Sequence, residues 1–545
     1  MSTNGGTLDQ ALDVLVVGGG ITGAGVAREA AGSGLNTLLV EQRDFAWGTS
    51  SRSSKMVHGG LRYLGSGQWR LAREAVRERQ RLLTEAPGLV DPLPFVMAHR
   101  AGEFPGPGLF QGLLRLYDRL GHTRTRRRLT PAECRAFWVP GLADEALAGA
   151  SVFSDAVTDD ARLVLRVLDE ARQDGARTRN YTRALSVAAP GADGRRRVVL
   201  EDVDTGDRTE VAARLVIKAT GAWGGLPHDS ENPPQGNPGL TIRPLRGSHL
   251  VLPWHRLPVT CAVTLLHPDD RRPVFAFPWH GTTVLGTTDL DHRDSLEHEP
   301  RITPEEVHYL VAIADRLFPG PPVAPGDILS TWAGVRPVVT RTSAHGDQQK
   351  APSRENREHV LQVSPGQVTI AGGKLTTFRC IARAALRKGF GSLSESTQSL
   401  RPEALPVFRP ASAELRRPEG LGHRQWQRLQ GYYGARLADL LDTAPMTPVP
   451  GTDVLWAELV WACQQEQVRH LDDLMLRRSR LGLILPRGGE ACLDDLRRHC
   501  QPALGWTDAQ WQRETERYRT IYQQAYQVPA NEAPHPRTDD SGATG

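Results

Sequence analysis

The sequence has 545 residues, 39% of them hydrophobic and 23% charged, and it carries a net charge of +4. This composition is typical of a globular protein with two or three domains, and so small an excess of positive charge does not indicate a nucleic-acid-binding protein. The six cysteines form no C-x-x-C pair, and no apolar run reaches the ~20 residues that span a bilayer. We therefore predict a reducing compartment, no disulfide framework, no metal site and no signal peptide or membrane span.

A dinucleotide-binding unit is predicted near the N-terminus. Residues 11–17 (ALDVLVV) are an apolar run suited to a buried parallel strand, and Gly18, Gly20 and Gly23 follow in a G-x-G-x-x-G pattern. A helix and a second strand ending at Glu41 are expected next. Such glycines permit a tight turn and a close approach to a pyrophosphate, and the acid can bind both ribose hydroxyls. The acid argues against NADP, but the pattern does not separate NAD from FAD.

The following segment, residues 50–64 (SSRSSKMVHGGLRYL), is polar, basic and rich in serine. It has neither the alternation of a half-buried strand nor the spacing of an amphipathic helix. It leaves the second predicted strand at its carboxyl end, where ligands bind in sheets of this kind. We therefore expect this segment to contact a ligand rather than a protein core.

Further strands are expected at 215–221 and 368–377, and the latter passes through a Gly-Gly turn into a helix. The N-terminus of that helix would face an electron-rich group. Between them, residues 240–253, 272–289 and 327–339 are rich in β-branched residues and predict an inserted antiparallel sheet. The last quarter of the sequence has helical patterns only, which predicts a helical C-terminal domain.

Together these motifs resemble the FAD-dependent glycerol-3-phosphate dehydrogenases of the quinone-linked, membrane-associated type. The resemblance covers about residues 10 to 525. It is carried by DVLVVGGGITGAGVAREAAGSGL, TSSRSSKMVHGGLRYL, FSDAVTDDARLV, ATGAW, LRGSHLV, VLGTTD, WAGVRP, TIAGGKLTTFR and EQVRHLDDLMLRRSRLGL. Thr22 replaces a frequent Asn and Phe378 a frequent Tyr, and neither change puts the activity in doubt.

The resemblance implies an α/β fold with an FAD-binding Rossmann-like domain of the glutathione-reductase type, similar to D-amino-acid oxidase. An antiparallel-sheet substrate domain would be inserted into it, and a helical C-terminal domain would follow. We expect the cofactor domain at 10–75, 150–225 and 360–392, the substrate-binding cap at 76–149 and 226–359, the helical domain at 400–527, and a disordered tail at 529–545.

The activity that the resemblance implies is oxidation of sn-glycerol 3-phosphate to dihydroxyacetone phosphate by hydride transfer to a non-covalent FAD, with electrons passed to a membrane quinone. The residues carried over for FAD binding are Gly18, Gly20, Ile21, Thr22, Gly23, Glu41, Gln42, Thr49, Ser50, Ser53, Ser54, Lys55, His58, Gly60, Thr220, Gly221, Trp223, Gly334, Gly373, Lys374, Leu375 and Thr376.

Catalysis is carried over to His58, His249, Arg336 and Lys374. The residues expected to bind the substrate are Arg62, Tyr63, Thr287, Arg336, Arg354 and Lys374. The substrate is a phosphate dianion, which arginines bind through paired hydrogen bonds. The C2 hydroxyl must lose a proton, for which histidine is the usual base. His58 and His249 are both candidates, and the sequence does not choose between them.

Two alternatives remain open. A glycerol-3-phosphate oxidase would pass electrons to oxygen, and a non-catalytic flavin protein would act as a redox sensor. Residues 113–129 join an amphipathic helix to a basic cluster, which is either a contact with anionic lipid or a solvated basic face. From the family we expect a cytoplasmic protein attached peripherally to the inner face of the cell membrane, and a homodimer.

Overall fold

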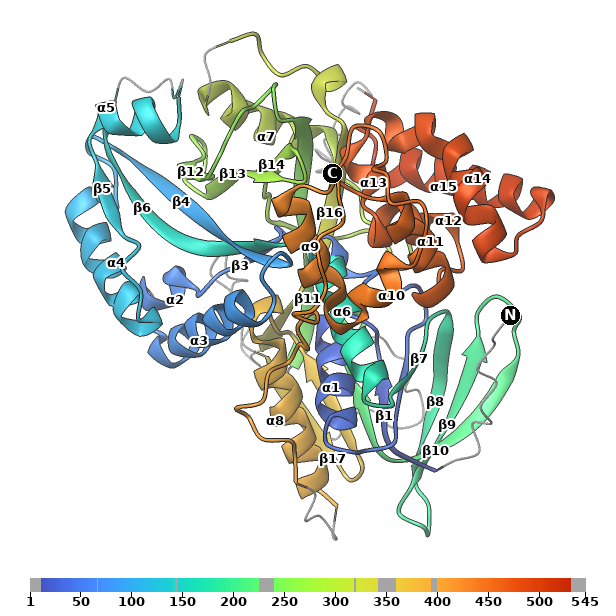
Figure 1. The fold of residues 1–545 in the computed structure, drawn as a ribbon. Coiled ribbons are helices and arrows are strands. Elements are labelled where there is room, and N and C mark those ends of the chain that lie inside the picture. Colours follow the sequence, from blue (N-terminus) through green and yellow to red (C-terminus); the bar gives the residue numbers. More distant parts are fainter. Residues whose placement is uncertain are drawn as a thin grey trace, which may run out of the picture.

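The computed structural model describes residues 11–65, 67–140, 142, 146–224, 240–317, 320–341, 359–393 and 399–530 (Figure 1). Two mixed sheets lie side by side, and helices flank them. The helices are α1 (Ile21–Ala31), α2 (Leu61–Gly65), α3 (Trp69–Glu85), α4 (Pro107–Gly121), α5 (Pro131–Glu133), α6 (Asp160–Gln173), α7 (Pro304–Leu317), α8 (Phe378–Gly391), α9 (His423–Tyr433), α10 (Leu437–Leu441), α11 (Trp456–Gln465), α12 (Leu471–Asp473), α13 (Leu481–Ile484), α14 (Leu493–Leu504) and α15 (Asp508–Ala525).

The first sheet is built around β1, which confirms the predicted strand–turn–helix–strand unit. The strand order is β17-β18-β10-β1-β2-β7. Strand β1 pairs in parallel with β2 and with β10. Strand β10 also pairs in parallel with β18, and β2 with β7. The strands are β1 (Leu12–Val17), β2 (Thr37–Val40), β7 (Arg177–Arg179), β8 (Thr182–Pro190), β9 (Arg196–Asp202), β10 (Arg208–Lys218), β17 (Val360–Ser364) and β18 (Gln367–Ala371).

Strand β1 is apolar along its whole length because both faces of the sheet are covered. Val14 and Val16 face α1, α6 and α8. Leu12 and Leu15 face the opposite side, where they pack with Val198 and other residues of the β8–β9–β10 ribbon. The parallel strands therefore end together at one edge, as a dinucleotide-binding sheet requires.

The second sheet is largely antiparallel and confirms the predicted inserted sheet. Its order is β15-β11-β14-β13-β12-β4-β6-β3, with β16 paired to β11 and β5 paired to β6. Among the described strands of this second sheet, only β4 and β12 pair in parallel. The strands are β3 (Met56–Val57), β4 (Val90–Arg100), β5 (Arg127–Leu129), β6 (Leu147–Thr158), β11 (Leu240–Pro253), β12 (Ala262–Leu266), β13 (Pro273–Trp279), β14 (Thr282–Gly286), β15 (Leu290–Asp291) and β16 (Ser330–Arg341).

The expected domain boundaries cross this sheet. The boundary between 149 and 150 falls inside β6, and β3 belongs to the second sheet although it precedes residue 75. Met56 and Val57 of β3 pair with β6 inside the segment that showed no strand pattern. A two-residue strand is too short to produce a detectable alternation.

The C-terminal region is helical, as predicted. Helix α9 packs against α6, and α13 and α15 pack against β16 (Figure 1). Of the helices that the structure describes, none combines the length and the hydropathy that crossing a membrane demands.

Candidate active site

A cavity of about 360 Å³ opens at the carboxyl ends of β1, β2, β10 and β18. It lies where the sheet geometry predicts a dinucleotide. The predicted cofactor residues that line it are Gly18, Gly20, Ile21, Thr22, Glu41, Gln42, Thr49, Ser50, Ser53, Thr220, Gly221, Trp223, Gly373, Lys374 and Leu375.

Other lining residues were not anticipated. The stretch 182–187, which begins β8, forms one wall, and Trp47, Gly48, Lys218, Glu297 and Pro337 contribute to others. The run 182–187 carries no ligand-binding motif, and it reaches the cavity because Tyr181 and Thr182 hydrogen-bond to Arg43 and Glu41. Trp47 lies two positions before the predicted residue Thr49, and this closeness in the sequence was the signal that could have pointed to it.

Gly18, before α1, and Gly23, in the first turn of α1, leave no room for a side chain. A Cβ on Gly18, whose φ is +114°, would lie 2.5 Å from the Ala219 carbonyl oxygen, and one on Gly23 would lie 1.9 Å from the Gly18 oxygen. The hydroxyl of Ser50 accepts a hydrogen bond from the Ile21 amide at 3.0 Å. The turn is therefore closed by β10 on one side and by the segment after β2 on the other.

Glu41 lies on the cavity wall directly after β2. Its carboxylate accepts hydrogen bonds from the amides of Gly19 at 2.6 Å and Arg43 at 2.9 Å. Burial raises its pKa, although these two amides act against that shift. The carboxylate thus ties the glycine turn to the end of β2, in the position expected of an acid that binds ribose.

The cavity has the properties that a flavin nucleotide needs. The indole nitrogen of Trp223 is buried at its wall and has no hydrogen-bond partner among the described residues. Trp47 packs against Trp223 with ring centroids 5.7 Å apart. Backbone amides at the glycine turn and a buried donor without a partner suit a polar, planar ligand with a pyrophosphate.

Not every predicted cofactor residue reaches this cavity. Those absent from its lining are Gly23, Ser54, Lys55, His58, Gly60, Gly334 and Thr376. Lys55 is buried and donates to Asp160 at 2.8 Å and to the Ser51 carbonyl at 2.7 Å. Gly334 leaves room for the Arg52 carbonyl oxygen, which a Cβ would approach to 2.2 Å.

Three neighbouring strands of the second sheet bring Arg336, Thr287 and His249 together. Arg336 of β16 donates to the Thr287 hydroxyl at 3.1 Å and to Asp289 at 2.8 Å. Gly247 of β11 makes this possible, since a Cβ there would lie 2.3 Å from the Arg336 guanidinium. The register pairs His249 of β11 with Gly286 of β14, directly before Thr287. These predicted residues therefore form one cluster.

His249 is buried and stacks on Trp332, with ring centroids 4.9 Å apart and ring planes 19° from parallel. Its Nε2 shares a hydrogen bond of 2.9 Å with the Ser54 hydroxyl, and its Nδ1 has no partner among the described residues. Burial, followed by the charges of Arg336 and Lys55, holds its pKa well below 6.5. The imidazole is therefore neutral at pH 7.

His58 lies in an exposed position between β3 and α2, and its carbonyl accepts a hydrogen bond from Thr376 at 3.3 Å. This hydrogen bond joins the segment between β3 and α2 to the turn before α8. The Gly59-Gly60 pair beside it serves the protein itself, because a Cβ on Gly59 would lie 2.3 Å from the Tyr117 hydroxyl and one on Gly60 would lie 2.1 Å from the Tyr63 ring. Gly60 was among the residues expected to bind FAD.

Lys374 connects the cavity to α2. Its Nζ lies 3.8 Å from the centroid of the Tyr63 ring, a cation–π contact, and Lys374 also lines the cavity. Arg62 lies in α2, but its side chain is outside the described part of the structure, as is the whole of Arg354. Lys374 and Arg336 are thus the two predicted phosphate-binding cations whose positions are described.

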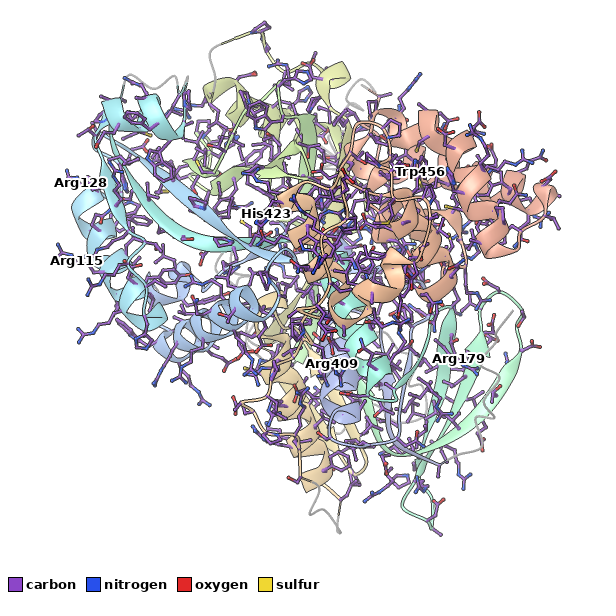
Figure 2. The ribbon with its side chains drawn as sticks, viewed as in Figure 1. Arg115, Arg128, Arg179, Arg409, His423 and Trp456 are labelled. Carbon is purple, nitrogen blue, oxygen red and sulfur yellow. The ribbon has the colours of Figure 1, made fainter. Side chains whose placement is uncertain are left out.

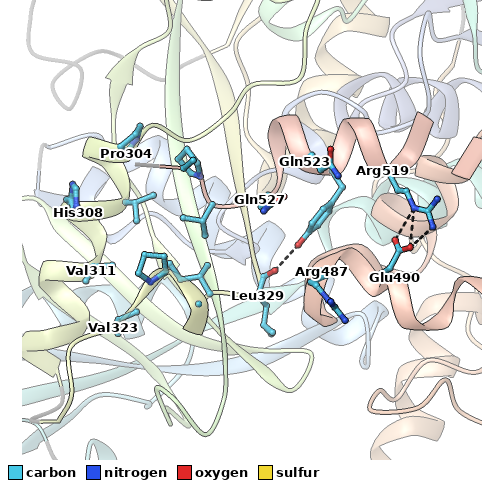
Figure 3. A pocket seen from close by; sticks show the side chains of 18 of the residues that line it. Pro304, His308, Val311, Val323, Leu329, Arg487, Glu490, Arg519, Gln523 and Gln527 are labelled. Carbon is cyan, nitrogen blue, oxygen red and sulfur yellow. Dashed lines mark hydrogen bonds and ion pairs between the residues drawn. The ribbon is translucent and has the colours of Figure 1, made fainter. Parts of the chain in front are cut away.

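A second cavity, of about 900 Å³, lies between α7 and the C-terminal helices (Figure 3). Val307, Val311 and Val323 form an apolar wall, and Arg519 and Glu490 are paired at 2.5 Å on the opposite side. The Tyr522 hydroxyl donates to the Leu329 carbonyl at 2.8 Å across it. This cavity contains none of the predicted site residues, and its contacts fasten α15 to the second sheet.

Comparison with known families agrees with this geometry. The family model described as "FAD dependent oxidoreductase" matches residues 13–379, and the one described as "C-terminal domain of alpha-glycerophosphate oxidase" matches residues 370–511.

Individual relatives cover nearly the whole chain. "Glycerol-3-phosphate dehydrogenase 2" of Mycobacterium tuberculosis is 33% identical over 93% of this chain and 87% of its own length. "Glycerol-3-phosphate dehydrogenase" of Pseudomonas aeruginosa is 34% identical over 88% of this chain and 93% of its own. Among solved structures, the glycerol-3-phosphate dehydrogenase from Bacillus halodurans complexed with FAD superposes with a TM-score of 0.72 at 26% identity, covering 95% of both chains.

Both the sequence motifs and the fold had pointed to one family. The match at more than 30% identity over most of the chain confirms that resemblance. The chain therefore belongs to the FAD-dependent oxidoreductases and, within them, to the glycerol-3-phosphate dehydrogenase family.

Proposed function

We propose that this protein oxidises sn-glycerol 3-phosphate to dihydroxyacetone phosphate with FAD as the hydride acceptor and a membrane quinone as the final electron acceptor. The observation that carries the proposal is the cluster of Arg336, Thr287 and His249, which the hydrogen bond from His249 to Ser54 joins to the segment that lines the cofactor cavity at residues 49, 50 and 53. Such a cluster supplies a cation for a phosphate and a neutral base for a hydroxyl.

FAD, when bound, supplies the two-electron acceptor for the hydride that leaves C2 of the substrate. The glycine turn at Gly18 and Gly20 would hold its pyrophosphate, and Glu41 its ribose. Lys374 and Gly373, at the start of the turn before α8, would lie beside the flavin ring. We assign these residues to cofactor binding on the basis of their place in the lining.

Substrate binding is assigned to Arg336 and Lys374. The guanidinium of Arg336 is oriented before any ligand arrives, since Asp289 and Thr287 hold two of its nitrogens. A phosphate dianion bound by a fixed arginine and a lysine would be held by two cations, which favours one orientation of the three-carbon chain. Arg62, Tyr63 and Arg354 remain proposed substrate residues from the family pattern.

We assign the proton of the C2 hydroxyl to His249. Its neutral imidazole keeps Nδ1 without a partner among the described residues, while Nε2 is held by Ser54. A base fixed in this way can accept a proton without first losing one. His58 is the competing candidate, and its exposed position leaves it in exchange with solvent.

The decisive experiment is an anaerobic spectrum. Purified holoprotein is mixed with glycerol 3-phosphate in the absence of oxygen. The absorbance band of the oxidised flavin, at ~450 nm, should be bleached within seconds. Glycerol without the phosphate serves as the control and should leave the spectrum unchanged. An unbleached flavin would favour the non-catalytic redox sensor.

The electron acceptor is decided by a second measurement. The match of residues 370–511 to the C-terminal domain of an oxidase supports oxygen as a second candidate. Under air, we expect reduction of a soluble quinone analogue to outpace formation of hydrogen peroxide by at least about tenfold. Stoichiometric peroxide in the presence of quinone would identify an oxidase instead.

Attachment to a membrane is proposed through the face formed by α4, β5 and the segment that follows. Phe104, Leu109 and Phe137 are 78%, 61% and 77% exposed there. Arg115 and Arg128 point outward from the same edge of the molecule (Figure 2). Exposed apolar rings among arginines are typical of a protein that lies on an anionic bilayer.

Vesicle sedimentation tests this attachment. The protein should sediment with vesicles that contain anionic lipid and remain free of purely zwitterionic ones, and added salt should weaken its binding. A variant with Phe104→Ser and Phe137→Ser should lose binding and keep its flavin. Equal sedimentation of both proteins would reject this face.

A further inference from the structure

We propose that Arg480, in the C-terminal helical region, is a positioning residue for FAD: it holds residues 47–55, here called the cofactor loop, in the shape that binds the flavin nucleotide. No described residue beyond 375 lines the cofactor cavity. The C-terminal region would nevertheless be part of the cofactor site, through the back of the loop. The inference rests on the FAD site proposed above and is independent of the substrate.

The cofactor loop is anchored from behind on Asp160, the first residue of α6. The amide and hydroxyl of Ser53 donate to Asp160 Oδ2 at 2.9 and 2.7 Å. Lys55 donates to Oδ1 at 2.8 Å and also to the Ser51 carbonyl at 2.7 Å. Because Ser53 lines the cavity, any movement of Asp160 would be transmitted to the cofactor.

Arg480 fixes this carboxylate from the other side. Its Nη2 donates to Asp160 Oδ1 at 2.5 Å and to Asp159 Oδ1 at 2.9 Å, and its Nη1 lies 3.3 Å from the Ser51 carbonyl oxygen. Arg480 therefore contacts the loop directly and also through Asp160. Arg480 directly precedes α13 and lies more than 400 positions after Ser51 in the sequence.

The four charges involved are removed from solvent. Lys55 and Asp160 have no exposed surface, and Arg480 and Asp159 are 2% and 4% exposed. Two cations face the two carboxylates, and His280 Nε2 lies 3.5 Å from Asp159, so removal of the charge of Arg480 would leave the buried carboxylates with too little compensation. Lys55 cannot take over both roles, because an ammonium lacks the planar fork that contacts Asp159, Asp160 and Ser51 together.

A second contact from the C-terminal region reaches the same loop. The Tyr526 hydroxyl, just beyond α15, accepts hydrogen bonds from Arg52 at 3.2 and 3.1 Å and donates to Glu299 at 2.9 Å. The Arg52 guanidinium lies over the Trp47 ring at 4.8 Å, and Trp47 lines the cavity. The C-terminal region thus contacts the loop at Ser51 and at Arg52, through Arg480 and Tyr526, neither of which lines the cavity.

The test compares Arg480→Lys with Arg428→Lys. Arg428 forms a largely buried pair with Glu458, at 2.8 and 2.6 Å, with the Arg428 side chain 12% exposed, in the same helical region but away from the loop. FAD binding to each apoprotein is measured by quenching of flavin fluorescence. We expect the dissociation constant to rise at least about tenfold for Arg480→Lys and less than about twofold for the control. Equal changes in the two variants would overturn the proposal.

Hydrogen exchange of the apoproteins gives a readout without cofactor. The amides of Ser53 and Lys55 should exchange faster in Arg480→Lys than in wild type, whereas Arg428→Lys should match wild type in the loop. Unchanged exchange of the loop would refute positioning. If no Arg480 variant folds, Tyr526→Phe is used, and it should weaken FAD binding without lowering the thermal midpoint of the apoprotein; unaltered binding would count against the proposal.

A double-mutant cycle separates positioning from general destabilisation. If Arg480 acts through Asp160 and Ser53, then Arg480→Lys combined with Ser53→Ala should raise the FAD dissociation constant by less than the product of the single effects. For the pair Arg428→Lys and Ser53→Ala, the effects of the two substitutions on the FAD dissociation constant should multiply. Multiplicative effects in both pairs would show that Arg480 does not act through the loop. A wild-type apoprotein that binds no FAD would instead refute the cofactor site itself.

Discussion

Asp289 pairs with two arginines, one through each carboxylate oxygen: Oδ1 lies 2.8 Å from Arg336 Nη1, and Oδ2 lies 3.3 Å from Arg272 Nη2. The carboxylate is 2% exposed at its side chain, whereas Arg336 is 24% exposed. A buried anion shared by two arginines therefore points one of them toward the cluster with His249. Arg336 does not have to be ordered when a phosphate binds, which lowers the entropic cost of binding.

The first prediction concerns this shared carboxylate. Asp289→Asn keeps the size of the side chain but removes the charge that orients Arg336, so KM for glycerol 3-phosphate should rise by about tenfold. Steady-state kinetics with a quinone analogue measures the change. Asp291→Asn is the control, since Asp291 pairs with Arg243 at 2.6 Å and not with Arg336. A KM that changes equally in both variants would contradict the assignment.

The second prediction concerns Lys374. Lys374→Met removes the ammonium beside Tyr63 and the cavity, so the affinity for glycerol 3-phosphate should fall by at least about tenfold while FAD remains bound. The dissociation constant can be read from the substrate dependence of anaerobic flavin bleaching. Lys388→Met, on the exposed end of α8, should behave as wild type. Loss of FAD without any change in substrate affinity would limit Lys374 to the cofactor.

The third prediction is a pH dependence. His249 faces Ser54, Trp332, Arg336 and Lys55, and its pKa is held well below 6.5 by burial, Arg336 and Lys55 in that order. A base works when neutral, so flavin reduction at saturating substrate should stay constant from pH 8 to 6.5 and fall only below that value. Arg336→Met removes a cation, raises the pKa of His249, and should shift this acidic limb to higher pH.

The same profiles distinguish the two histidines. His249→Ala should lower the rate of flavin reduction by at least about tenfold and abolish the acidic limb. His58→Ala should leave the limb where it is. If the limb instead vanishes in His58→Ala and persists in Arg336→Met without a shift, His58 is the base.

The fourth prediction concerns stability. Burial alone would raise the pKa of Asp44, but Arg478 and Arg477 lower it from 3.8 to about 2. A carboxyl whose pKa is lower in the folded protein stabilises it above pH 3.8, and this contribution disappears as the pH falls toward 2. Asp44→Asn should therefore destabilise the protein at pH 7 by ~2 kcal/mol or more.

Thermal unfolding of wild type and Asp44→Asn between pH 7 and pH 3 tests this sign. The difference between their midpoints should shrink as the pH falls toward 3. Asp439→Asn, at an exposed pair with Arg436, is the control and should differ little from wild type at any pH. A difference that grows toward acid would contradict the depressed pKa of Asp44.

The elements predicted best are those that a local pattern in the sequence marks, either the periodicity of apolar residues or the spacing of glycines. Strand β1, the turn at Gly18, helix α1 and the end of β2 at Glu41 all lie where the pattern placed them. Strands β13 and β14 were also found, because His280-Gly281 forms a clear turn between β-branched runs. In each of these cases, neighbouring residues in the sequence carry the information.

What escaped prediction depends on contacts between distant residues. Lys55 looked like a cofactor ligand, but Asp160 and the Ser51 carbonyl take all the hydrogen bonds recorded for its ammonium. The wall formed by 182–187 has no local motif and is placed by its pairing with the end of β2. Partners more than 100 positions apart, as Lys55 and Asp160 are, leave no periodic trace in one sequence.

The parallel core has a consequence for synthesis of the chain. Strand β1 pairs with β10, and β10 with β18, so the edge that receives the nucleotide is complete only after residue 371 has been made. Arg480 follows more than a hundred residues later. The glycine turn meets Glu41 and Ser50 early, but the edge around it stays incomplete until β18 has been made, so flavin acquisition should be a late event in the biogenesis of this protein.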